Sequence, residues 1–323
     1  MDNHGRRLNY LRLAVTDRCN LRCRYCMPAE GITSGRRDEV LTWEELRRLC
    51  RIFVELGIEK IRITGGEPFV RKGLLPFLLE LSQLPGCPEI DITTNGTLLA
   101  DHLDALKRIG VSRLNISLDT LNADTFYTIA RRRDFEKILQ AINKADTLGF
   151  KIKINVVVMA GINDHEISDF ISLTRDRKWT VRFIEPMPFD GVGGRYKSLL
   201  SGDDILTRLM RQFYIVPVSN GKSAVATLFQ VPGFQGRIGI IYGYSRRFCG
   251  ACSRLRLSTR GELLTCLYGS PVLDMGALLR AGKSDGSVKR AISGAVGKRL
   301  SDGFEAERAF NKTTFHSMAT IGG

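Results

Sequence analysis

The sequence has no long hydrophobic run and no dense block of charge. No apolar stretch approaches the roughly 18 residues that a membrane helix needs, so we expect no membrane span. Residues 1–7 are mostly polar, and no hydrophobic core of a signal peptide follows them. The net charge is +14, but the basic residues are dispersed, and we expect the run Arg131-Arg132-Arg133 to be a solvated face. No DNA- or RNA-binding motif accompanies them. We therefore expect a cytoplasmic protein that binds neither membranes nor nucleic acid.

Histidine is scarce, with 4 residues in the chain, whereas there are 8 cysteines. In an intracellular chain such cysteines indicate metal binding or catalysis rather than disulfides. Cys19, Cys23 and Cys26 follow the spacing C-x3-C-x2-C, and no histidine lies in their loop. Three thiolates can hold an iron–sulfur cluster while one iron stays open for chemistry. A structural zinc is the alternative, but zinc sites favour two C-x2-4-C pairs or histidine ligands.

A second cysteine triple lies in the C-terminal third of the chain. Two residues separate Cys249 from Cys252, and thirteen residues separate Cys252 from Cys266. Two interpretations stay open for this triple. One is a second cluster with its own open iron, and the other is a Cys3His zinc site with His316 as the fourth ligand.

Strand-like and helix-like segments alternate between residues 10 and 190. The strand candidates are 10–15, 60–64, 89–93, 113–118, 151–158 and 181–185, and the helix candidates are 42–56, 74–84, 98–109, 122–148 and 164–177. An open doubly wound sheet and a barrel both satisfy this order, and six units favour a partial barrel. We therefore predict an α/β fold in which residues 1–190 form a partial (β/α)6 TIM-type barrel. Residues 191–323 are expected to form a C-terminal α+β extension that closes the barrel mouth.

Four of these strands carry one basic residue between apolar neighbours. The four residues are Arg12, Arg62, Lys153 and Arg182. Since side chains alternate along a strand, the apolar neighbours should face the helices and the cations the interior. Burying several unpaired cations is costly, so the interior needs carboxylates or a polyanionic ligand. Asp91 and Asp119 are too few to neutralise the set, and the pattern therefore favours a phosphorylated substrate.

The turn Gly65-Gly66-Glu67-Pro68 follows one of the strands, and adjacent glycines let a ligand approach the backbone closely. Together with the first cysteine loop, it resembles the radical S-adenosylmethionine (SAM) superfamily. There the open iron chelates the amino and carboxyl groups of the methionine moiety, and this turn binds the amino group. The resemblance implies reductive cleavage of SAM to a 5′-deoxyadenosyl radical, which abstracts hydrogen from a substrate.

Further runs narrow the resemblance. They include Thr93-Thr94-Asn95-Gly96, Asn115-Ile116-Ser117-Leu118-Asp119, Lys153-Ile154-Asn155-Val156-Val157, Arg182-Phe183-Ile184-Glu185, the second cysteine triple and the terminal Ile321-Gly322-Gly323. The chain resembles the molybdenum cofactor biosynthesis protein A family of GTP 3′,8-cyclases over nearly its whole length. That resemblance implies conversion of GTP into (8S)-3′,8-cyclo-7,8-dihydroguanosine 5′-triphosphate, the first step of molybdenum cofactor biosynthesis.

The resemblance also assigns roles by position. It implies two [4Fe–4S] clusters, a catalytic one on Cys19, Cys23 and Cys26, and an auxiliary one on Cys249, Cys252 and Cys266 that takes the guanine end of GTP. The positions that match SAM contacts are Tyr25, Gly66, Ser117 and Met187. The positions that match GTP contacts are Arg12, Arg62, Thr93, Lys153, Arg254 and Arg256, with Arg182 beside them, and the tail Gly322-Gly323 is expected to enter the site.

The resemblance further implies an external one-electron donor, a downstream cyclic pyranopterin monophosphate synthase and a homodimer. Two alternatives remain. A radical SAM maturase acting on a peptide would share the barrel, although such maturases generally carry more C-terminal cysteines and need no barrel cations. A non-enzymatic zinc or nucleic-acid-binding protein would explain the charge and the C-x2-C pair, but not the Gly-Gly-Glu-Pro turn.

Overall fold

The structure is a computed structural model that describes residues 1–32, 35–36, 38–187, 200–219, 225–310 and 318–322. Within these ranges twelve strands form one sheet, in the order β12-β11-β10-β1-β2-β3-β4-β5-β6-β9-β8-β7. The strands are β1 (Tyr10–Ala14), β2 (Lys60–Thr64), β3 (Glu89–Thr94), β4 (Arg113–Ser117), β5 (Lys151–Val157), β6 (Thr180–Ile184), β7 (Val216–Val218), β8 (Ala226–Gln230), β9 (Arg237–Ile241), β10 (Arg254–Leu257), β11 (Glu262–Leu264) and β12 (Leu273–Asp274).

The helices are α1 (Trp43–Glu55), α2 (Leu74–Ser82), α3 (Leu103–Ile109), α4 (Ala123–Ala130), α5 (Phe135–Thr147), α6 (Ile167–Ser172), α7 (Gly202–Gln212), α8 (Met275–Arg280), α9 (Asp285–Val296), α10 (Gly303–Ala309) and α11 (Met318–Ile321). Short 3-10 helices are η1 (Pro68–Val70), η2 (Asp164–Glu166) and η4 (Cys249–Ala251). In the described part of the chain, no helix combines the length and the apolar character needed to cross a membrane.

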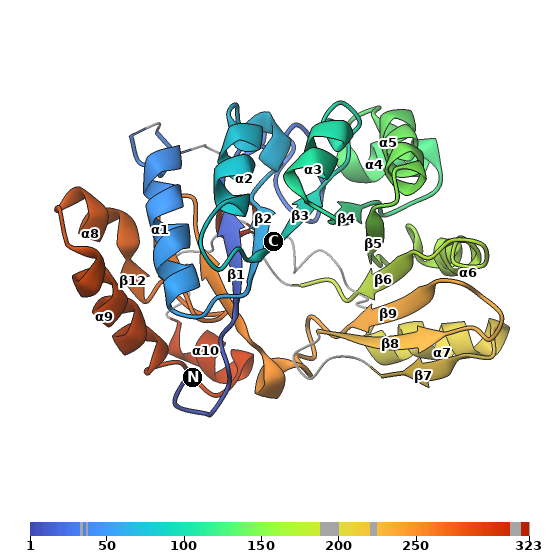
Figure 1. Ribbon diagram of the computed structural model, residues 1–323. Helices are drawn as coiled ribbons and strands as arrows, with labels where there is room; N and C mark the ends of the chain where they lie inside the picture. Colours follow the sequence, from blue (N-terminus) through green and yellow to red (C-terminus); the bar gives the residue numbers. More distant parts are fainter. Residues whose placement is uncertain (33–34, 37, 188–199, 220–224, 311–317, 323) are drawn as a thin grey trace.

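Six parallel strands form the centre of the sheet. Strands β1 to β6 pair in sequence order, and helices α1 to α6 connect them (Figure 1). Each predicted strand lies within one residue of the observed bounds, which confirms the predicted α/β alternation. Because the strands are parallel, their carboxyl ends all lie at one edge of the sheet, where the loops that follow them gather.

Strands from the C-terminal part extend this sheet at both edges. Strand β10 pairs in parallel with β1, and β9 pairs in parallel with β6. The predicted parts 1–190 and 191–323 therefore share one hydrogen-bonded sheet rather than forming two separate sheets. The boundary falls within residues 188–199, which lie outside the described residues, and closure of the barrel mouth by the extension stays a prediction.

The single helix predicted over residues 122–148 is wrong, because two helices occupy this segment. Helix α4 ends where Arg131 adopts a left-handed backbone conformation with φ of 56°. A right-handed helix cannot continue through that conformation. Helix α5 then starts afresh at Phe135. The break leaves the last carbonyl groups of α4 available to a neighbouring loop.

The central strands turn their apolar residues toward the helices and their cations to the opposite face. In β1, Leu11 and Leu13 are fully buried in the hydrophobic core, and Arg12 between them lines a cavity. In β2, Ile61 and Ile63 enclose Arg62 in the same way. This is the inward orientation that the alternation predicts.

Candidate functional site

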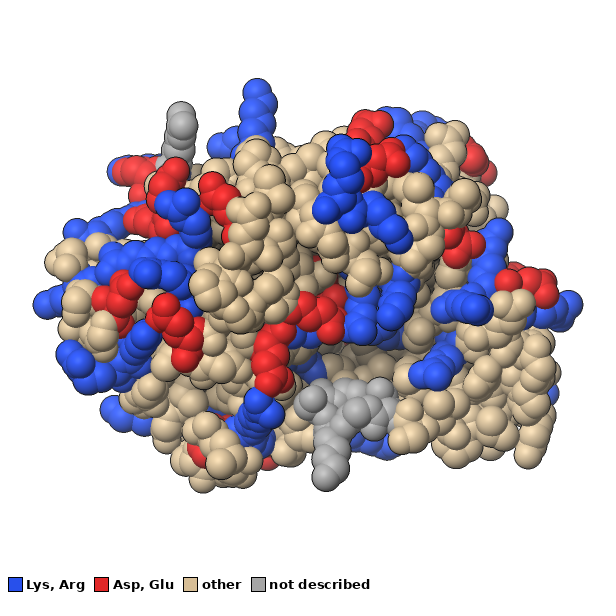
Figure 2. Space-filling view, in the orientation of Figure 1, with Lys and Arg blue, Asp and Glu red and all other residues tan. Residues whose placement is uncertain are grey.

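Three of the cavities among the described residues contain most of the residues singled out from the sequence. The first cysteine cavity, of about 220 Å³, is lined by Cys19, Cys23 and Cys26. The cationic cavity, of about 680 Å³, is lined by basic side chains. The second cysteine cavity, of about 50 Å³, is lined by Cys249, Cys252 and Cys266. Figure 2 shows Lys and Arg side chains bordering a hollow in the middle of the molecule.

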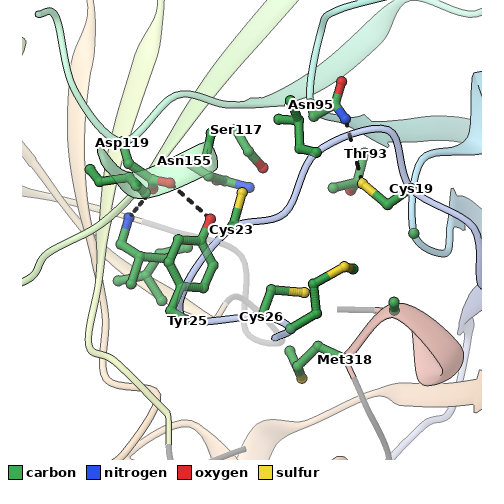
Figure 3. A pocket seen from close by; sticks show the side chains of 18 of the residues that line it. Cys19, Cys23, Tyr25, Cys26, Thr93, Asn95, Ser117, Asp119, Asn155 and Met318 are labelled. Carbon is green, nitrogen blue, oxygen red and sulfur yellow. Dashed lines mark hydrogen bonds between the residues drawn. The ribbon is translucent and has the colours of Figure 1, made fainter. Parts of the chain in front are cut away.

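The first cysteine cavity also receives the residues expected at SAM. Tyr25, Gly66, Ser117 and Met187 all line it. Figure 3 shows the three cysteine side chains and Tyr25 projecting from one loop, with Ser117 on the neighbouring sheet. Strand β1 delivers the loop, and strand β4 ends at Ser117, so the two come together at the carboxyl edge of the sheet.

The cysteine loop is held by α4 and by Arg131. The backbone N–H groups of Arg22 and Arg24 donate to the carbonyl oxygens of Ala130 and Ile129, at 3.0 and 2.9 Å. Nη1 of Arg131 donates to the carbonyl oxygens of Arg22 and Met27, at 3.0 and 3.2 Å. Arg131 therefore does not belong to a solvated face, and that expectation was wrong for this residue.

The Gly-Gly turn lies against the start of the cysteine loop. The backbone N–H of Gly66 donates to the carbonyl oxygen of Thr16 at 2.7 Å. A Cβ added at Gly65 would come within 2.2 Å of the Thr16 oxygen, and one at Gly66 within 2.3 Å of the Arg18 oxygen. No side chain fits such spaces, so glycine is required at both positions.

Buried Glu67 connects the turn with the loop after β3. Its carboxylate accepts hydrogen bonds from the Thr94 hydroxyl at 2.9 Å and from the Asn95 N–H at 2.6 Å. Burial raises the pKa of Glu67 to about 7. Nδ2 of Asn95 lies 3.7 Å from Sγ of Cys19, to which it donates. Asn95 thus links the turn to a cysteine that sequence patterns assign to a cluster.

Asp119 has a different partner from the one expected. It was considered as a counter-charge for the barrel cations, but its carboxylate accepts a hydrogen bond from the Tyr25 hydroxyl at 2.8 Å (Figure 3). Its other oxygen accepts from the N–H of Val157 at 2.8 Å. Burial raises the pKa of Asp119 to about 6, and burial followed by the nearby Asp119 charge raises the pKa of Tyr25. Asp119 therefore orients the cysteine loop.

The thiols of Cys19, Cys23 and Cys26 suit an iron–sulfur cluster better than a disulfide-forming redox pair of exposed cysteines. All eight cysteines are free. Burial raises the pKa of the Cys19 and Cys23 thiols, so they stay neutral until a metal replaces their protons. Within the residues that the structure describes, no three His, Cys, Asp or Glu side chains converge closely enough to hold a metal ion. Three undisulfided thiols on one cavity wall nevertheless provide the ligands that a cluster with an open iron requires.

The cationic cavity gathers every side chain expected at GTP that lies in the barrel or on β10. These are Arg12, Arg62, Thr93, Lys153, Arg182, Arg254 and Arg256. Nη2 of Arg62 donates to Asp91 at 2.6 Å, and Nζ of Lys60 lies 2.6 Å from the same carboxylate oxygen. One carboxylate therefore serves two cations.

Lys153 and Arg182 form no ion pair with any carboxylate of the described residues. Burial, and then the charge of Arg182, lower the pKa of Lys153 to about 8. Burial and Arg62 lower the pKa of Arg182 to about 9. Buried polar atoms without a hydrogen-bond partner in the described structure include Thr93 Oγ1, Asn155 Oδ1 and Nε of Arg182. Such an excess of positive charge and of free polar atoms suits a polyanionic ligand.

The cationic cavity adjoins both cysteine cavities. It shares Thr93, Asn155 and Met187 with the first and Arg254 and Arg256 with the second. Asn155 was not predicted as a site residue, although it stands two positions after Lys153 on β5 and so shares its face. A ligand in the cationic cavity could therefore reach from the first cysteine triple to the second.

Two predicted residues fall outside the description. His316, the alternative zinc ligand, and Gly323, the last residue of the tail, lie outside the described residues. Gly322 is described, and its carbonyl oxygen accepts hydrogen bonds from Arg12 and Arg256.

Comparison with known proteins places this geometry in context. Residues 13–174 match the radical SAM superfamily, and residues 179–304 match the description Molybdenum Cofactor Synthesis C. A GTP 3′,8-cyclase of Geobacter sulfurreducens is 44% identical over 100% of this chain and 99% of its own length. Molybdenum cofactor biosynthesis protein 1 of Bos taurus is 43% identical over 92% of this chain, which spans 47% of that relative. The chain thus spans about half the length of the relatives of that name.

The fold also resembles a solved structure. Streptococcus suis SuiB bound to S-adenosylmethionine superposes with a TM-score of 0.61, at 14% identity, over 91% of this chain and 68% of that chain. At that identity the likeness concerns the fold, and it agrees with the arrangement of strands and helices described above.

Proposed function

The chain belongs to the radical SAM superfamily and, within it, to the GTP 3′,8-cyclases, and we propose that it converts GTP into (8S)-3′,8-cyclo-7,8-dihydroguanosine 5′-triphosphate. The observation that carries this proposal is the cationic cavity between the two cysteine cavities. A nucleoside triphosphate has a polyanionic end and an aromatic end, and such a cavity offers cations to one and a second cysteine site to the other. A peptide substrate has no comparable need for buried cations.

The first cysteine cavity is proposed to hold SAM next to a [4Fe–4S] cluster on Cys19, Cys23 and Cys26. When bound, the cluster supplies the electron that cleaves SAM to the 5′-deoxyadenosyl radical. Tyr25 and Ser117 line the cavity in positions to contact the nucleoside, and Gly66 leaves the backbone accessible to the methionine moiety.

The cationic cavity is proposed to hold the triphosphate. Arginine contacts phosphate oxygens with two parallel hydrogen bonds, whereas lysine acts as a point charge. Lys153 and Arg182, which form no ion pair in the described structure, carry the charge that a phosphate group would neutralise. A bound phosphate thereby offsets the burial and, secondarily, the repulsion between cations that lower both pKa values.

The wall shared by the two cavities is proposed to position the reacting carbon. Hydrogen transfer to the 5′-deoxyadenosyl radical requires C3′ of GTP close to the adenosyl carbon. The C3′ radical then attacks C8 of guanine, and one electron from the external donor and one proton complete the product. Thr93 and Met187 line both cavities, so they border the space in which that transfer would take place.

The second cysteine triple is proposed to hold an auxiliary [4Fe–4S] cluster that binds the guanine end. Cys249, Cys252 and Cys266 line one cavity, and Arg254 and Arg256 connect it to the cationic cavity. We further propose an external one-electron donor, a downstream cyclic pyranopterin monophosphate synthase, a homodimer in the cytoplasm, and functional parts that divide near residue 190.

An anaerobic assay tests the proposal. Reconstituted protein is incubated with SAM, dithionite and GTP, and the products are read by mass spectrometry. The wild type should yield 5′-deoxyadenosine and an isomer of GTP. A Cys249→Ala/Cys252→Ala/Cys266→Ala variant should lose the isomer, whereas a Cys50→Ala control, at a buried core cysteine, should keep it. Formation of 5′-deoxyadenosine with unchanged GTP would mean that the substrate is another molecule.

A further inference from the structure

A buried polar cluster lies beside the second cysteine cavity and comes from the two ends of the chain. It consists of Asp2, Arg6 and Arg299, which are 7%, 8% and 4% exposed. Nε of Arg6 lies 2.7 Å from Oδ2 of Asp2, and Nη1 of Arg299 lies 3.7 Å from the same oxygen. In the described part of the chain, Asp2 is the one carboxylate paired with either arginine, so two buried cations share one anion.

Arg6 fastens the N-terminal residues to two C-terminal segments. Its Nη1 donates to the carbonyl oxygens of Cys249 at 3.2 Å and Ser301 at 2.5 Å, and its Nη2 donates to that of Leu300 at 2.7 Å. Asp2 holds Arg6 in this orientation, because Oδ1 also accepts the Arg6 N–H at 2.9 Å. Arg6 thus holds the backbone at Cys249, the first residue of the second cysteine triple.

Arg299 contacts the second ligand position. Its Nη1 donates to the carbonyl oxygen of Cys252 at 2.9 Å, and its positive charge, with that of Arg254, lowers the pKa of the Cys252 thiol against the effect of burial. Its charge acts on Cys266 as well, and Arg299 itself lines the second cysteine cavity. Arg299, which shares Asp2 with Arg6, therefore lies beside the thiol triple.

We propose that Arg299, oriented by Asp2, is a positioning residue that offsets the negative charge of an iron–sulfur cluster on Cys249, Cys252 and Cys266. This inference rests on the proposed function, since it presumes the auxiliary cluster. A cation close to an iron–sulfur cluster stabilises the reduced, more negative form of that cluster. Arg299 should therefore raise the reduction potential of this cluster and slow the loss of its iron.

The inference predicts a difference between charge-keeping and charge-removing variants. All are made in a Cys19→Ala/Cys23→Ala/Cys26→Ala background, which leaves the second triple as the cluster site under study. Arg299→Gln should shift the midpoint potential downward and lower the affinity for iron by about 10–100-fold, as loss of outer hydrogen bonds to metal ligands typically does. Arg299→Lys should stay near the background values. Lys298→Gln, at an exposed neighbour, is the matched control.

Potential is read by EPR-monitored titration, and iron retention by chelator competition under anaerobic conditions. Circular dichroism of the metal-free proteins establishes whether each variant folds. If Arg299→Gln fails to fold, Arg299→Met replaces it. In that variant Asp2 keeps Arg6 as its partner. An apolar side chain of similar length is often tolerated where it replaces a buried charged one.

The outcomes separate this inference from the function on which it rests. A lowered potential in Arg299→Gln or Arg299→Met, with Arg299→Lys and Lys298→Gln unchanged, supports it. Bound iron with the same potential and retention in every variant overturns the role of Arg299 and leaves the auxiliary cluster intact. A background protein that binds no iron overturns both.

Discussion

The Nε of Arg12 donates a hydrogen bond to the carbonyl oxygen of Gly322, at 3.0 Å and across 310 positions of sequence. Nη1 of Arg256 donates to the same oxygen at 2.6 Å. Both arginines line the cationic cavity, so Gly322 lies at the edge of the proposed triphosphate site. The tail backbone thereby supplies a hydrogen-bond acceptor to two cations that are also expected to contact the substrate.

Gly322→Ala should displace this tail. Gly322 has φ of 74°, and a Cβ there would lie 2.1 Å from Oγ1 of Thr64. We expect activity to fall by about 100-fold, the scale of a misplacement of about 1 Å at a reacting centre. The double variant Gly322→Ala/Thr64→Ala should recover part of the activity, because the obstructing oxygen is removed.

The matched control for this variant is Gly282→Ala, where φ is 68° and no atom lies within 4 Å of the added Cβ. It imposes the same backbone strain without a collision, so its activity should stay near that of the wild type. Equal losses at both glycines would show that strain, rather than displacement of the tail, explains the effect.

The affinity for GTP should depend on pH through Lys153. Burial and Arg182 lower its pKa to about 8 in the free protein, and bound phosphate favours the charged form. Affinity is therefore full below pH 8 and should weaken by up to about tenfold per pH unit above it. Calorimetric titration with GTP from pH 7 to pH 9 measures this.

Lys153→Arg is the control, since a guanidinium stays charged over that range. Superimposable pH profiles for Lys153→Arg and the wild type would argue against Lys153 as the titrating group.

Arg131→Ala should weaken the hold on the first cysteine loop. The variant loses the hydrogen bonds to the carbonyl oxygens of Arg22 and Met27, at a cost of about 1–3 kcal/mol. Iron reconstituted on a protein that lacks the second cysteine triple should dissociate faster in a chelator. The exposed neighbour Arg133 provides the control variant Arg133→Ala.

Arg131→Gly distinguishes the side chain from the backbone, because glycine adopts the left-handed conformation without strain. If the hydrogen bonds matter, the glycine variant loses iron as the alanine variant does. Retention like that of the wild type would assign the effect of Arg131→Ala to strain alone.

Glu67→Gln should change how stability depends on pH. Burial raises the pKa of Glu67 from 4.5 to about 7, so the folded state holds its proton more tightly than the unfolded state. This stabilisation is complete below pH 4.5 and is lost as pH rises through 7, by about 3 kcal/mol. In Glu67→Gln, an NH2 group replaces one of the two oxygens that accept the N–H groups of Phe69 and Asn95, and it cannot accept either of them at any pH. The wild type should therefore be the more stable protein at pH 5, and the difference should narrow by pH 8.

Urea unfolding of the metal-free proteins at both pH values gives the difference in free energy. Thr94→Ser is a suitable control, since it keeps the hydroxyl that donates to Glu67. A constant difference between Glu67→Gln and the wild type across this range would contradict the raised pKa.

The spacing of residues along the chain was sufficient to predict the alternating strands and helices and the use of cysteines as cluster ligands. The alternation around Arg12 and Arg62 placed both cations on the inner face, because side-chain direction in a strand depends only on position parity. Cysteines separated by two or three residues can share one cluster whatever the surrounding fold. Both inferences therefore needed no knowledge of distant contacts.

The prediction of a long helix failed where a single residue adopts a left-handed backbone conformation. The pattern over 122–148 remained amphipathic throughout, and nothing in it revealed the left-handed conformation of Arg131. The partner of Asp119 was also misjudged, because a carboxylate after a strand can turn either to the barrel cations or to the loop that carries Tyr25.

The sequence by itself thus determined the order of strands and helices, the inward cations and the two cysteine triples. Only the tertiary structure decided that Arg12 donates a hydrogen bond to Gly322 and that Arg131 holds the first cysteine loop. It also decided that Arg299 donates to the carbonyl oxygen of Cys252. The physical reason is that periodicity and ligand spacing act between near neighbours in sequence. Hydrogen bonds between distant segments depend on how the sheet is assembled and on which loops meet at its edge.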